Sequence, residues 1–178
     1  DPLDTGLLLM GVGEGIKKLN ELLKLPKTYE VAIRLGEKTT TGDLEGEVIE
    51  KKSITECKEE EVRSILQSME GTLTLPVPRF SAVKVAGEVL YKKARRGENF
   101  TPPKRTMQLF DQWVKKCYKS DDICICTAVM TVGSGTYVRA LVEELGERLR
   151  IPATIEELRR TQIGNFNVTD AYKLHDIH

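Results

Sequence analysis

The chain has 178 residues, of which 40% are hydrophobic and 30% charged, and this fits one domain with a continuous core. No apolar run is long enough to span a membrane, and the N-terminal stretch lacks the basic flank and cleavage site of a signal peptide, so we expect a cytoplasmic protein. The formal net charge of zero argues mildly against nucleic-acid binding, because proteins that neutralise phosphates usually carry a basic surface.

The N-terminal stretch predicts a turn, a strand and a helix. "DPLDTG" (residues 1–6) combines proline, aspartate, threonine and glycine, which favour turns. "LLLMGVG" (7–13) predicts a buried strand, and residues 14–25 predict an amphipathic helix. The apolar face of that helix would carry Ile16, Leu19, Leu22 and Leu23. "GVGEG" lacks the third glycine of the dinucleotide fingerprint GxGxxG, so we interpret it as a structural turn and expect no nucleotide cofactor.

Residues 27–52 alternate apolar and polar side chains, which is typical of half-buried strands. One face of the first strand carries Tyr29, Val31, Ile33 and Leu35. The glycine-containing stretch "TTTGDLEG" then predicts a connection into a second strand, and residues 59–69 predict a surface helix.

The rest of the chain mixes strands and helices without strict βαβ alternation. Prolines limit residues 75–87 to a loop or sheet edge and then a short strand, and residues 88–97 predict a short helix ending in basic residues and glycine. Residues 106–119 and 123–132 predict a hairpin across "SDD", and residues 135–149 predict the strongest helix. This order favours an α+β fold over a doubly wound sheet.

The four cysteines, Cys57, Cys117, Cys124 and Cys126, show no CxxC spacing, and both histidines lie in the last four residues. We therefore expect neither a zinc site nor a histidine base. Cys124 and Cys126 would share one face of a strand, where small buried thiols are the expected state. Any catalytic group is then expected to be a carboxylate, a lysine, a tyrosine or a hydroxyl.

Two features suggest anion binding, each with a simpler alternative. In "GSGTYVRALVEELG" the glycines turn the chain into a helix whose first turn carries Arg139, although a cation is disfavoured at that end of a helix. Arg139 either pairs weakly with Glu143 or reaches a phosphate or buried carboxylate, which its guanidinium could hold through two oxygens. The run from Lys92 to Arg105 has six cations and one anion, and it is either a solvated surface or a phosphate-binding one.

Five separated motifs stand in a definite order: "DPLDTGLLLMGVG", "KTYEVAIRLGEKTTTGDLEG", "FSAVKVAGEVLYKKARRG", "GSGTYVRALVEELGERL" and "LRRTQIGNF". Their order and approximate spacing resemble the bacterial TruB family of tRNA pseudouridine synthases. The resemblance covers essentially the whole chain. It implies one catalytic domain, residues 1–178, with a pseudouridine synthase-like α+β fold in which helices flank a mixed, mainly antiparallel sheet. It also implies that the segment before the catalytic loop and a C-terminal RNA-binding PUA domain are missing.

The resemblance further implies a set of site residues. Asp1 matches the aspartate of the family's catalytic loop and would act as nucleophile or base. Arg139 would pair with that aspartate and keep it ionised. Tyr29 would stack on the flipped uridine, and Tyr137 and Leu158 would line the uracil pocket. In isolation, Asp1 is an ordinary turn residue, and Tyr29 and Leu158 are core residues.

The implied reaction converts uridine 55 of the tRNA T loop to pseudouridine and requires no cofactor and no metal. The expected partner is the T-arm of tRNA, bound by a monomer that needs no membrane and no protein partner. Possible RNA contacts are Lys84, Lys92, Lys93, Arg95, Arg96, Lys104 and Arg105. Phe80 replaces a family tyrosine, which removes a hydroxyl.

Two alternatives remain open at this point. The chain could be a non-catalytic RNA-binding or tRNA-folding module of the same fold. It could also be a glycoside hydrolase that uses Asp1 and Asp4, since such enzymes employ paired carboxylates. The lack of an aromatic-rich sugar platform speaks against the hydrolase.

Overall fold

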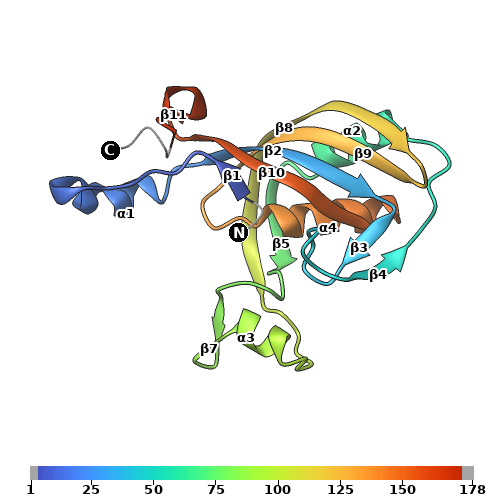
Figure 1. The fold of residues 1–178 in the computed structure, drawn as a ribbon, viewed down its shortest axis with the longest axis horizontal. Coiled ribbons are helices and arrows are strands. Elements are labelled where there is room, and N and C mark those ends of the chain that lie inside the picture. The colour runs from blue at the N-terminus through green and yellow to red at the C-terminus, as the bar shows by residue number, and fades with distance from the viewer. Residues whose placement is uncertain (1–3, 174–178) are drawn as a thin grey trace.

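A single mixed sheet organises the fold (Figure 1). The computed structural model describes residues 4–173, and its main sheet has seven strands in the order β1-β10-β2-β9-β8-β5, with β11 paired to β10. The strands are β1 (Asp4–Gly6), β2 (Lys27–Leu35), β5 (Gly71–Pro76), β8 (Lys104–Ser120), β9 (Ile123–Val132), β10 (Ala153–Ile163) and β11 (Phe166–Asn167). All pairings within this sheet are antiparallel except β1 with β10. The predicted α+β fold with a mainly antiparallel sheet is therefore confirmed.

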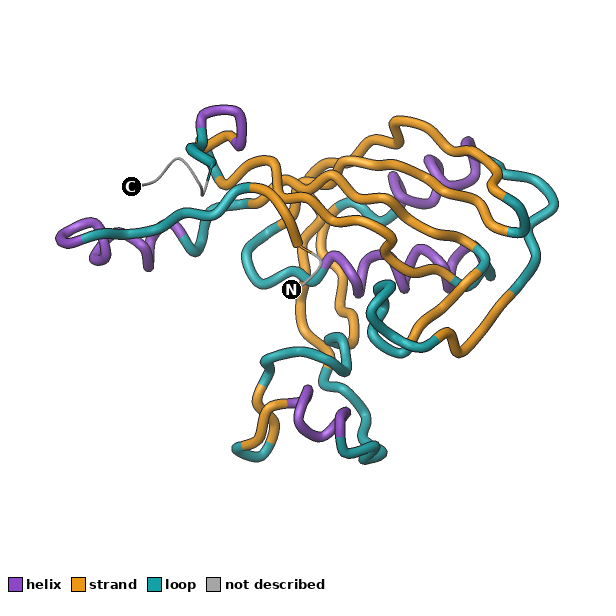
Figure 2. Tube along the Cα trace, viewed as in Figure 1, coloured by secondary structure: helices purple, strands orange, loops and turns teal. Residues whose placement is uncertain are grey.

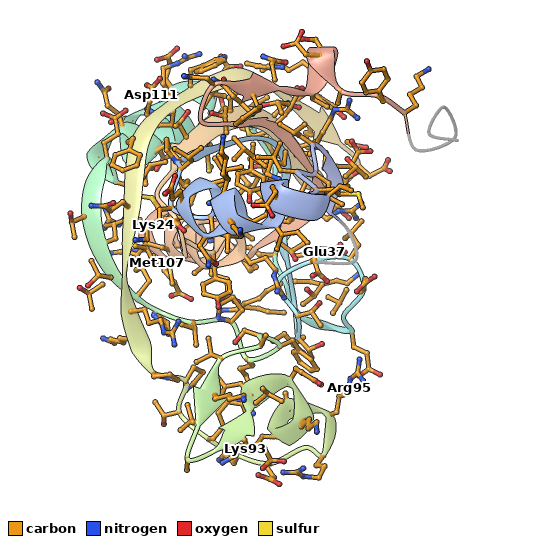
Figure 3. All side chains as sticks on the ribbon, turned by 90° about the vertical axis from the view of Figure 1, so that its left-hand side faces the viewer. Lys24, Glu37, Lys93, Arg95, Met107 and Asp111 are labelled. Atoms are coloured by element: carbon orange, nitrogen blue, oxygen red, sulfur yellow. A yellow bond between two sulfur atoms is a disulfide. The ribbon has the colours of Figure 1, made fainter. Side chains whose placement is uncertain are left out.

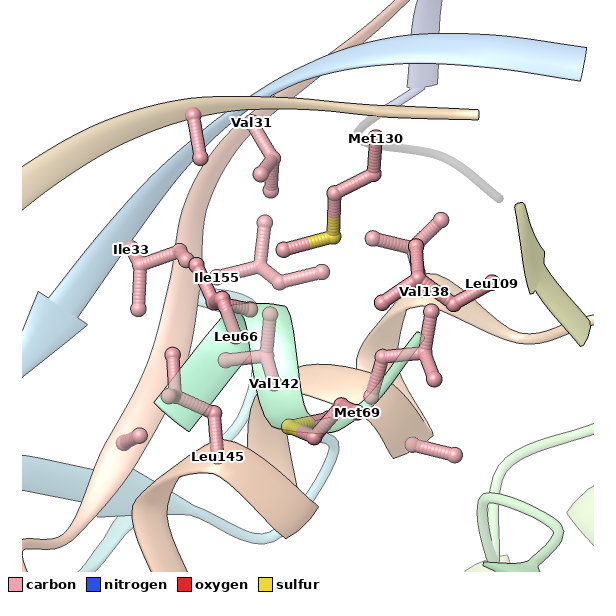
Figure 4. Close-up of a cluster of buried hydrophobic side chains, with 14 of the residues drawn as sticks. Val31, Ile33, Leu66, Met69, Leu109, Met130, Val138, Val142, Leu145 and Ile155 are labelled. Atoms are coloured by element: carbon pink, nitrogen blue, oxygen red, sulfur yellow. The ribbon is translucent and has the colours of Figure 1, made fainter. Parts of the chain in front are cut away.

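Two helices, α2 (Glu59–Ser68) and α4 (Val138–Leu149), enclose the core against the sheet (Figure 4). Helix α2 packs on β8, α4 packs on β10, and the two helices also contact each other. Leu66 of α2 and Leu145 of α4 are fully buried, as is Ile33 in the middle of β2. Burial of side chains of this size contributes about 1.5–3 kcal/mol each. No helix within residues 4–173 is both long and apolar enough to cross a bilayer.

The predicted alternation of β2 and the predicted β8–β9 hairpin are both confirmed. Val31, Ile33 and Leu35 are buried on the side of β2 that faces the helices, while the residues between them are half-buried. Strands β8 and β9 turn at Asp121 and Asp122, with Ser120 opposite Ile123. Strands β2, β9 and β8 are therefore consecutive neighbours in the main sheet.

Two smaller two-stranded units stand beside the main sheet. Strands β3 (Glu37–Thr39) and β4 (Val48–Lys51) pair around a loop, residues 40–46, that is fastened to β10 because the Ile155 N–H donates to the carbonyl of Gly42 at 3.0 Å. Strands β6 (Lys84–Val85) and β7 (Glu88–Val89) pair next to the short helix α3 (Leu90–Arg95).

Residues 77–103 form a small lobe that contains β6, β7 and α3. The lobe projects from one edge of the body and is joined to it by the ends of β5 and β8 (Figures 1 and 2). It is anchored by Leu90, which is 1% exposed, and by the Val77 N–H, which donates to the carbonyl of Pro103 at 3.0 Å.

The predicted buried strand over residues 7–13 is wrong. Strand β1 stops at Gly6, and the chain then leaves the sheet as an arm on which Leu8, Met10 and Val12 are 69%, 71% and 85% exposed. Pairing cannot continue because β11 folds back onto the same edge of β10 and takes the next positions, opposite Gln162 and Ile163.

The predicted amphipathic helix over residues 14–25 is only partly confirmed. The arm contains a 3-10 helix, η1 (Gly13–Lys18), and a single α-helical turn, α1 (Leu19–Leu22), neither of which has a buried residue. Two residues of the expected apolar face, Ile16 and Leu23, are 57% and 63% exposed. The other two residues of that face, Leu19 and Leu22, are half-buried, so the expected apolar face is only partly covered.

The expectation of buried free thiols is also wrong. Cys57 forms a disulfide with Cys124, and Cys117 forms one with Cys126. The reason is topological, because Cys117 on β8 stands directly opposite Cys126 on β9, and the segment before α2 brings Cys57 to Cys124. Spacing along the chain could not show these long-range partners.

Candidate active site

A cavity of about 570 Å³ opens where the sheet, the first turn of α4, the 40–46 loop and the small lobe meet. Its lining combines aromatic, cationic and carboxylate side chains from segments far apart in the sequence. The lining residues are Tyr29, Thr41, Asp43, Glu45, Phe80, Ser81, Ala82, Tyr91, Arg95, Thr136, Tyr137, Val138, Arg139 and Leu158. The structure thus brings together four of the predicted site residues: Tyr29, Tyr137, Arg139 and Leu158.

Arg139 lies in the first turn of α4, and its guanidinium bridges two loops. Nη1 donates to the carbonyl of Thr41 at 2.9 Å, and Nη2 donates to the carbonyl of Phe80 at 3.2 Å. Nη1 also lies 3.6 Å from Oδ2 of Asp43, and the Arg139 side chain is only 11% exposed. These acceptors offset the unfavourable position of a cation near a helix N-terminus. Arg139 therefore ties the small lobe and the 40–46 loop to the body.

Asp43 is the carboxylate that sequence reasoning did not assign to the site. It is 3% exposed, and its Oδ1 accepts hydrogen bonds from the Thr41 hydroxyl at 2.5 Å and from the Glu45 N–H at 3.1 Å. Asp43 stands in the "TTTGDLEG" motif, so the signal was present, but only the fold places it beside Arg139. Of the two predicted alternatives for Arg139, the contact with a buried carboxylate is realised.

Tyr29, Tyr137 and Leu158 come from three different elements that meet at the cavity. Tyr29 is near the start of β2, opposite Met130 of β9 and Arg160 of β10, and it packs half-buried against the core. Leu158 lies on β10 and is 6% exposed. Tyr137 caps α4, where Gly135 with φ +79 reverses the chain before the helix. Tyr29 and Leu158 thus contact the core and also line the cavity.

The small lobe contributes polar and cationic groups to the cavity wall. Arg95 lines the cavity and holds its guanidinium carbon 5.5 Å from the centre of the Tyr91 ring. The Ser81 hydroxyl is buried and makes no hydrogen bond with any residue in the described range. A buried hydroxyl without a partner is costly, so it is available to a bound ligand.

The predicted RNA-contacting cations gather on and beside the small lobe. Lys93 and Arg95 lie on this lobe, at the opposite end of the molecule from Asp111 (Figure 3). Lys84, Lys92, Arg95, Arg96, Lys104 and Arg105 are exposed, and Lys93 is half-exposed. Arg96 differs from the others because Glu88 and Glu98 bind it at 2.6 Å each, and hydrogen bonds from Arg96 lower the pKa of Glu88.

Glu143, four residues after Arg139, does not line this cavity. It lines a separate depression together with Lys38, Glu147 and Arg150. Burial raises the pKa of the Glu143 carboxyl, and the charges of Lys38 and Arg139 oppose that rise. Glu143 is thus a half-buried carboxylate on α4.

Asp1 lies outside the described residues, so its position relative to Arg139 stays a prediction. Among residues 4–173, the three side chains whose possible metal-ligand atoms lie within 4.8 Å of one another are Cys57, Cys124 and Cys126, and they do not line the cavity.

Solved structures share this fold. A chain of the structure described as "Crystal Structure of a Cbf5-Nop10-Gar1 Complex" superposes with a TM-score of 0.68 over 99% of this chain and 42% of its own length, at 23% identity. A chain of the "Structure of H/ACA RNP bound to a substrate RNA containing 2'-deoxyuridine" gives a TM-score of 0.61 over 93% of this chain and 37% of its own length, at 18% identity. The chain therefore has a pseudouridine synthase-like α+β fold.

Sequence comparison defines the family more narrowly. Residues 1–138 match the N-terminal domain of the TruB family pseudouridylate synthases, and residues 139–178 match the C-terminal domain of tRNA pseudouridylate synthase B. The chain belongs to the TruB family, as its motifs predicted. The two matched stretches meet inside α4 and thus do not mark a boundary in the fold.

Relatives named tRNA pseudouridine synthase B match nearly the whole chain. The protein of Burkholderia mallei (strain NCTC 10247) is 38% identical over 174 residues, which are 98% of this chain and 56% of that protein. The protein of Thermobifida fusca (strain YX) is 34% identical over 181 residues, which are 99% of this chain and 62% of that protein. The chain thus spans between half and two thirds of the length of these relatives.

Proposed function

We propose that residues 1–178 act as one catalytic domain that isomerises a uridine in the T loop of tRNA, uridine 55, to pseudouridine. The observation that carries the proposal is the gathering of Tyr29, Tyr137, Arg139 and Leu158 around one cavity. Because these residues come from a single chain, we infer that a monomer suffices and that no protein partner is required.

The cavity suits an extruded nucleobase. A stacked uridine must leave its helix before an enzyme can reach it, which costs a few kcal/mol. Stacking on an aromatic ring returns roughly 1–3 kcal/mol, and we assign this role to Tyr29. Tyr137 and Leu158 supply apolar walls, and the unpartnered Ser81 hydroxyl offers a hydrogen bond to a polar edge.

The chemistry requires one carboxylate, which we assign to Asp1. The reaction breaks the bond between the ribose and a ring nitrogen, rotates the uracil and forms a bond to a ring carbon, so atoms and electrons balance without a cofactor. Asp1 acts as nucleophile or base, and Arg139 holds it ionised in a site with little water. Asp43 positions Arg139 for that task.

The small lobe provides the phosphate-binding surface. Lys84, Lys92, Lys93 and Arg95 project from it, and Lys104 and Arg105 follow where β8 begins. Phosphate neutralisation by such side chains is sequence-independent and salt-dependent. We therefore propose that these cations contact the phosphates of the T-arm, so that the protein recognises the shape of the T-arm and not its base sequence.

The test is tritium release from T-arm RNA labelled at C5 of uridine, measured together with RNA binding by the same protein. Asp1→Asn abolishes release and leaves binding nearly unchanged. The matched control is Asp4→Asn, three residues further along the chain, which keeps turnover because a single carboxylate is needed. Turnover by Asp1→Asn would remove Asp1 from the mechanism.

The same assay separates the alternatives. RNA binding by the unaltered chain without tritium release would favour a non-catalytic tRNA-folding module. Release of free uracil would instead indicate hydrolysis of the glycosidic bond. Neither outcome is expected.

A further inference from the structure

All four cysteines of the chain meet at one place away from the candidate active site. Cys57 precedes α2, Cys117 belongs to β8, and Cys124 and Cys126 belong to β9. The Sγ atoms of Cys57, Cys124 and Cys126 lie within 4.8 Å of one another, and Cys117 is bonded to Cys126. The segment before α2, strand β8 and strand β9 thus bring the Sγ atoms of all four cysteines into one cluster.

The strands hold three of these cysteines together independently of any disulfide. Cys124 and Cys126 are two residues apart on β9 and share its helix-facing side. Cys117 is the cross-strand partner of Cys126, with a Cα–Cα distance of 4.1 Å. Sheet pairing alone therefore keeps their sulfurs adjacent.

The segment that carries Cys57 is also fixed by the fold. Before it, the Ile54 N–H donates to the carbonyl of Asp122 at 2.8 Å. After it, Oε2 of Glu59 accepts a hydrogen bond from the Cys117 N–H at 2.9 Å, which fastens the start of α2 to β8. Opening the disulfides would leave all four thiols gathered.

The distance between the non-bonded sulfurs of Cys124 and Cys126 suits a tetrahedral metal site. Structural zinc sites use four thiolates with Zn–S bonds of about 2.3 Å, which places the sulfurs about 3.8 Å apart. Sγ of Cys124 and Sγ of Cys126 are 3.7 Å apart. Soft thiolate ligands favour zinc over hard cations such as magnesium.

The cluster can also be reached from solvent. A depression of about 250 Å³ lies beside it and is lined by Cys57 and Cys124 together with Lys52 and Lys58. Cys57 is half-buried, whereas Cys124 and Cys126 are fully buried. An ion or a small oxidant therefore enters on the Cys57 side.

We propose that the four cysteines form a zinc site when they are reduced, and that oxidation to the two disulfides releases the metal. With hydrogen peroxide as the oxidant, four zinc-bound thiolates give up four electrons to two peroxide molecules. Two S–S bonds form, Zn²⁺ leaves, and four protons from solvent complete four water molecules. The proposal is independent of pseudouridine synthesis. It departs from the sequence analysis, which expected no zinc site because the cysteines lack CxxC spacing.

The test measures zinc bound to the full chain after reduction and removal of excess metal. We expect one zinc ion per chain, and we expect two molecules of hydrogen peroxide to release it with loss of all free thiols. Cys57→Ser leaves three thiolates and weakens zinc binding at least tenfold, while circular dichroism shows that the fold is kept because Cys57 is only half-buried at the edge of the core and serine is of similar size.

Matched controls test whether the ligands are these cysteines. His175 and His178 are the only histidines of the chain, and the double change to alanine leaves zinc binding unchanged. Reduced protein that binds no zinc would overturn the proposal, as would zinc retained when both Cys57 and Cys126 are serine. Zinc that stays bound after the peroxide has formed both disulfides would equally contradict it.

Discussion

Replacing Arg139 with lysine should lower the free energy of unfolding by about 1.5–3 kcal/mol, the value of one hydrogen bond made by a charged donor in a buried site. The guanidinium uses Nη1 for the Thr41 carbonyl and Nη2 for the Phe80 carbonyl, with Asp43 3.6 Å away. A single ammonium keeps the charge beside Asp43 but cannot reach both carbonyls. Arg139→Met removes the charge as well and should cost about 3–5 kcal/mol, because Asp43 is then buried without its cation.

Urea denaturation followed by circular dichroism measures these differences. The matched control is Arg148→Lys on the same helix, because Arg148 pairs with Glu144 at 2.7 Å on a more exposed surface. That change should cost less than about 1 kcal/mol. Equal destabilisation by Arg139→Lys and Arg148→Lys would refute the bridging role of Arg139. Equal values for Arg139→Lys and Arg139→Met would refute the contribution of the Asp43 pair.

Four further predictions concern other parts of the molecule. Lys92→Ala should reduce the slope of RNA affinity against salt by up to about 0.9, as expected for one lost phosphate contact, whereas Arg96→Ala should change it less because Glu88 and Glu98 already bind Arg96. The pKa of Glu143 is raised by burial, so the stability it contributes is present at low pH and is lost as pH rises through the folded-state pKa. In Glu143→Gln, the unfolding free energy should therefore decline less between acidic and neutral pH than in the unaltered chain. Urea titrations at several pH values measure this difference. Gly46→Ala would place a Cβ 2.7 Å from the Thr41 backbone nitrogen, and thermal unfolding should show a loss of about 1–3 kcal/mol. Leu145→Ala should cost about 2–5 kcal/mol in the same measurement, because Leu145 is fully buried between α4 and the sheet.

Local patterns predicted those elements whose own residues decide their structure. The alternation of residues 27–35 became β2, the helical spacing of residues 135–149 became α4, and the hairpin across Asp121 and Asp122 formed as expected. Each of these segments carries its own apolar face, so the spacing of apolar residues along it is enough to predict which side is buried.

The arm and the cysteines were missed because their outcomes depend on distant segments. Residues 7–13 are apolar enough for a strand, but β11 takes the edge of β10 that they would need. The cysteines lack a local motif, and only the register of β8 with β9 and the position of Cys57 bring them together.

The candidate site shows the same division. The resemblance to known motifs predicted Arg139, Tyr29, Tyr137 and Leu158, and all four line one cavity. Asp43 was recognised only as part of a motif, since its contact with Arg139 joins segments nearly a hundred residues apart. Long-range pairs of this kind leave no trace in a single sequence.

The position of β10 sets the order in which this chain can assemble during synthesis. Strand β10 lies between β1 and β2, yet it is made of residues 153–163, more than a hundred residues after both of them in the chain. A nascent chain can form the β8–β9 hairpin early, but the pairing of Thr5 with Arg159 closes a loop of more than 150 residues and must wait. Until β10 leaves the ribosome, the wall that Leu158 contributes to the cavity is missing, so a product that ends before β10 would lack a complete cavity.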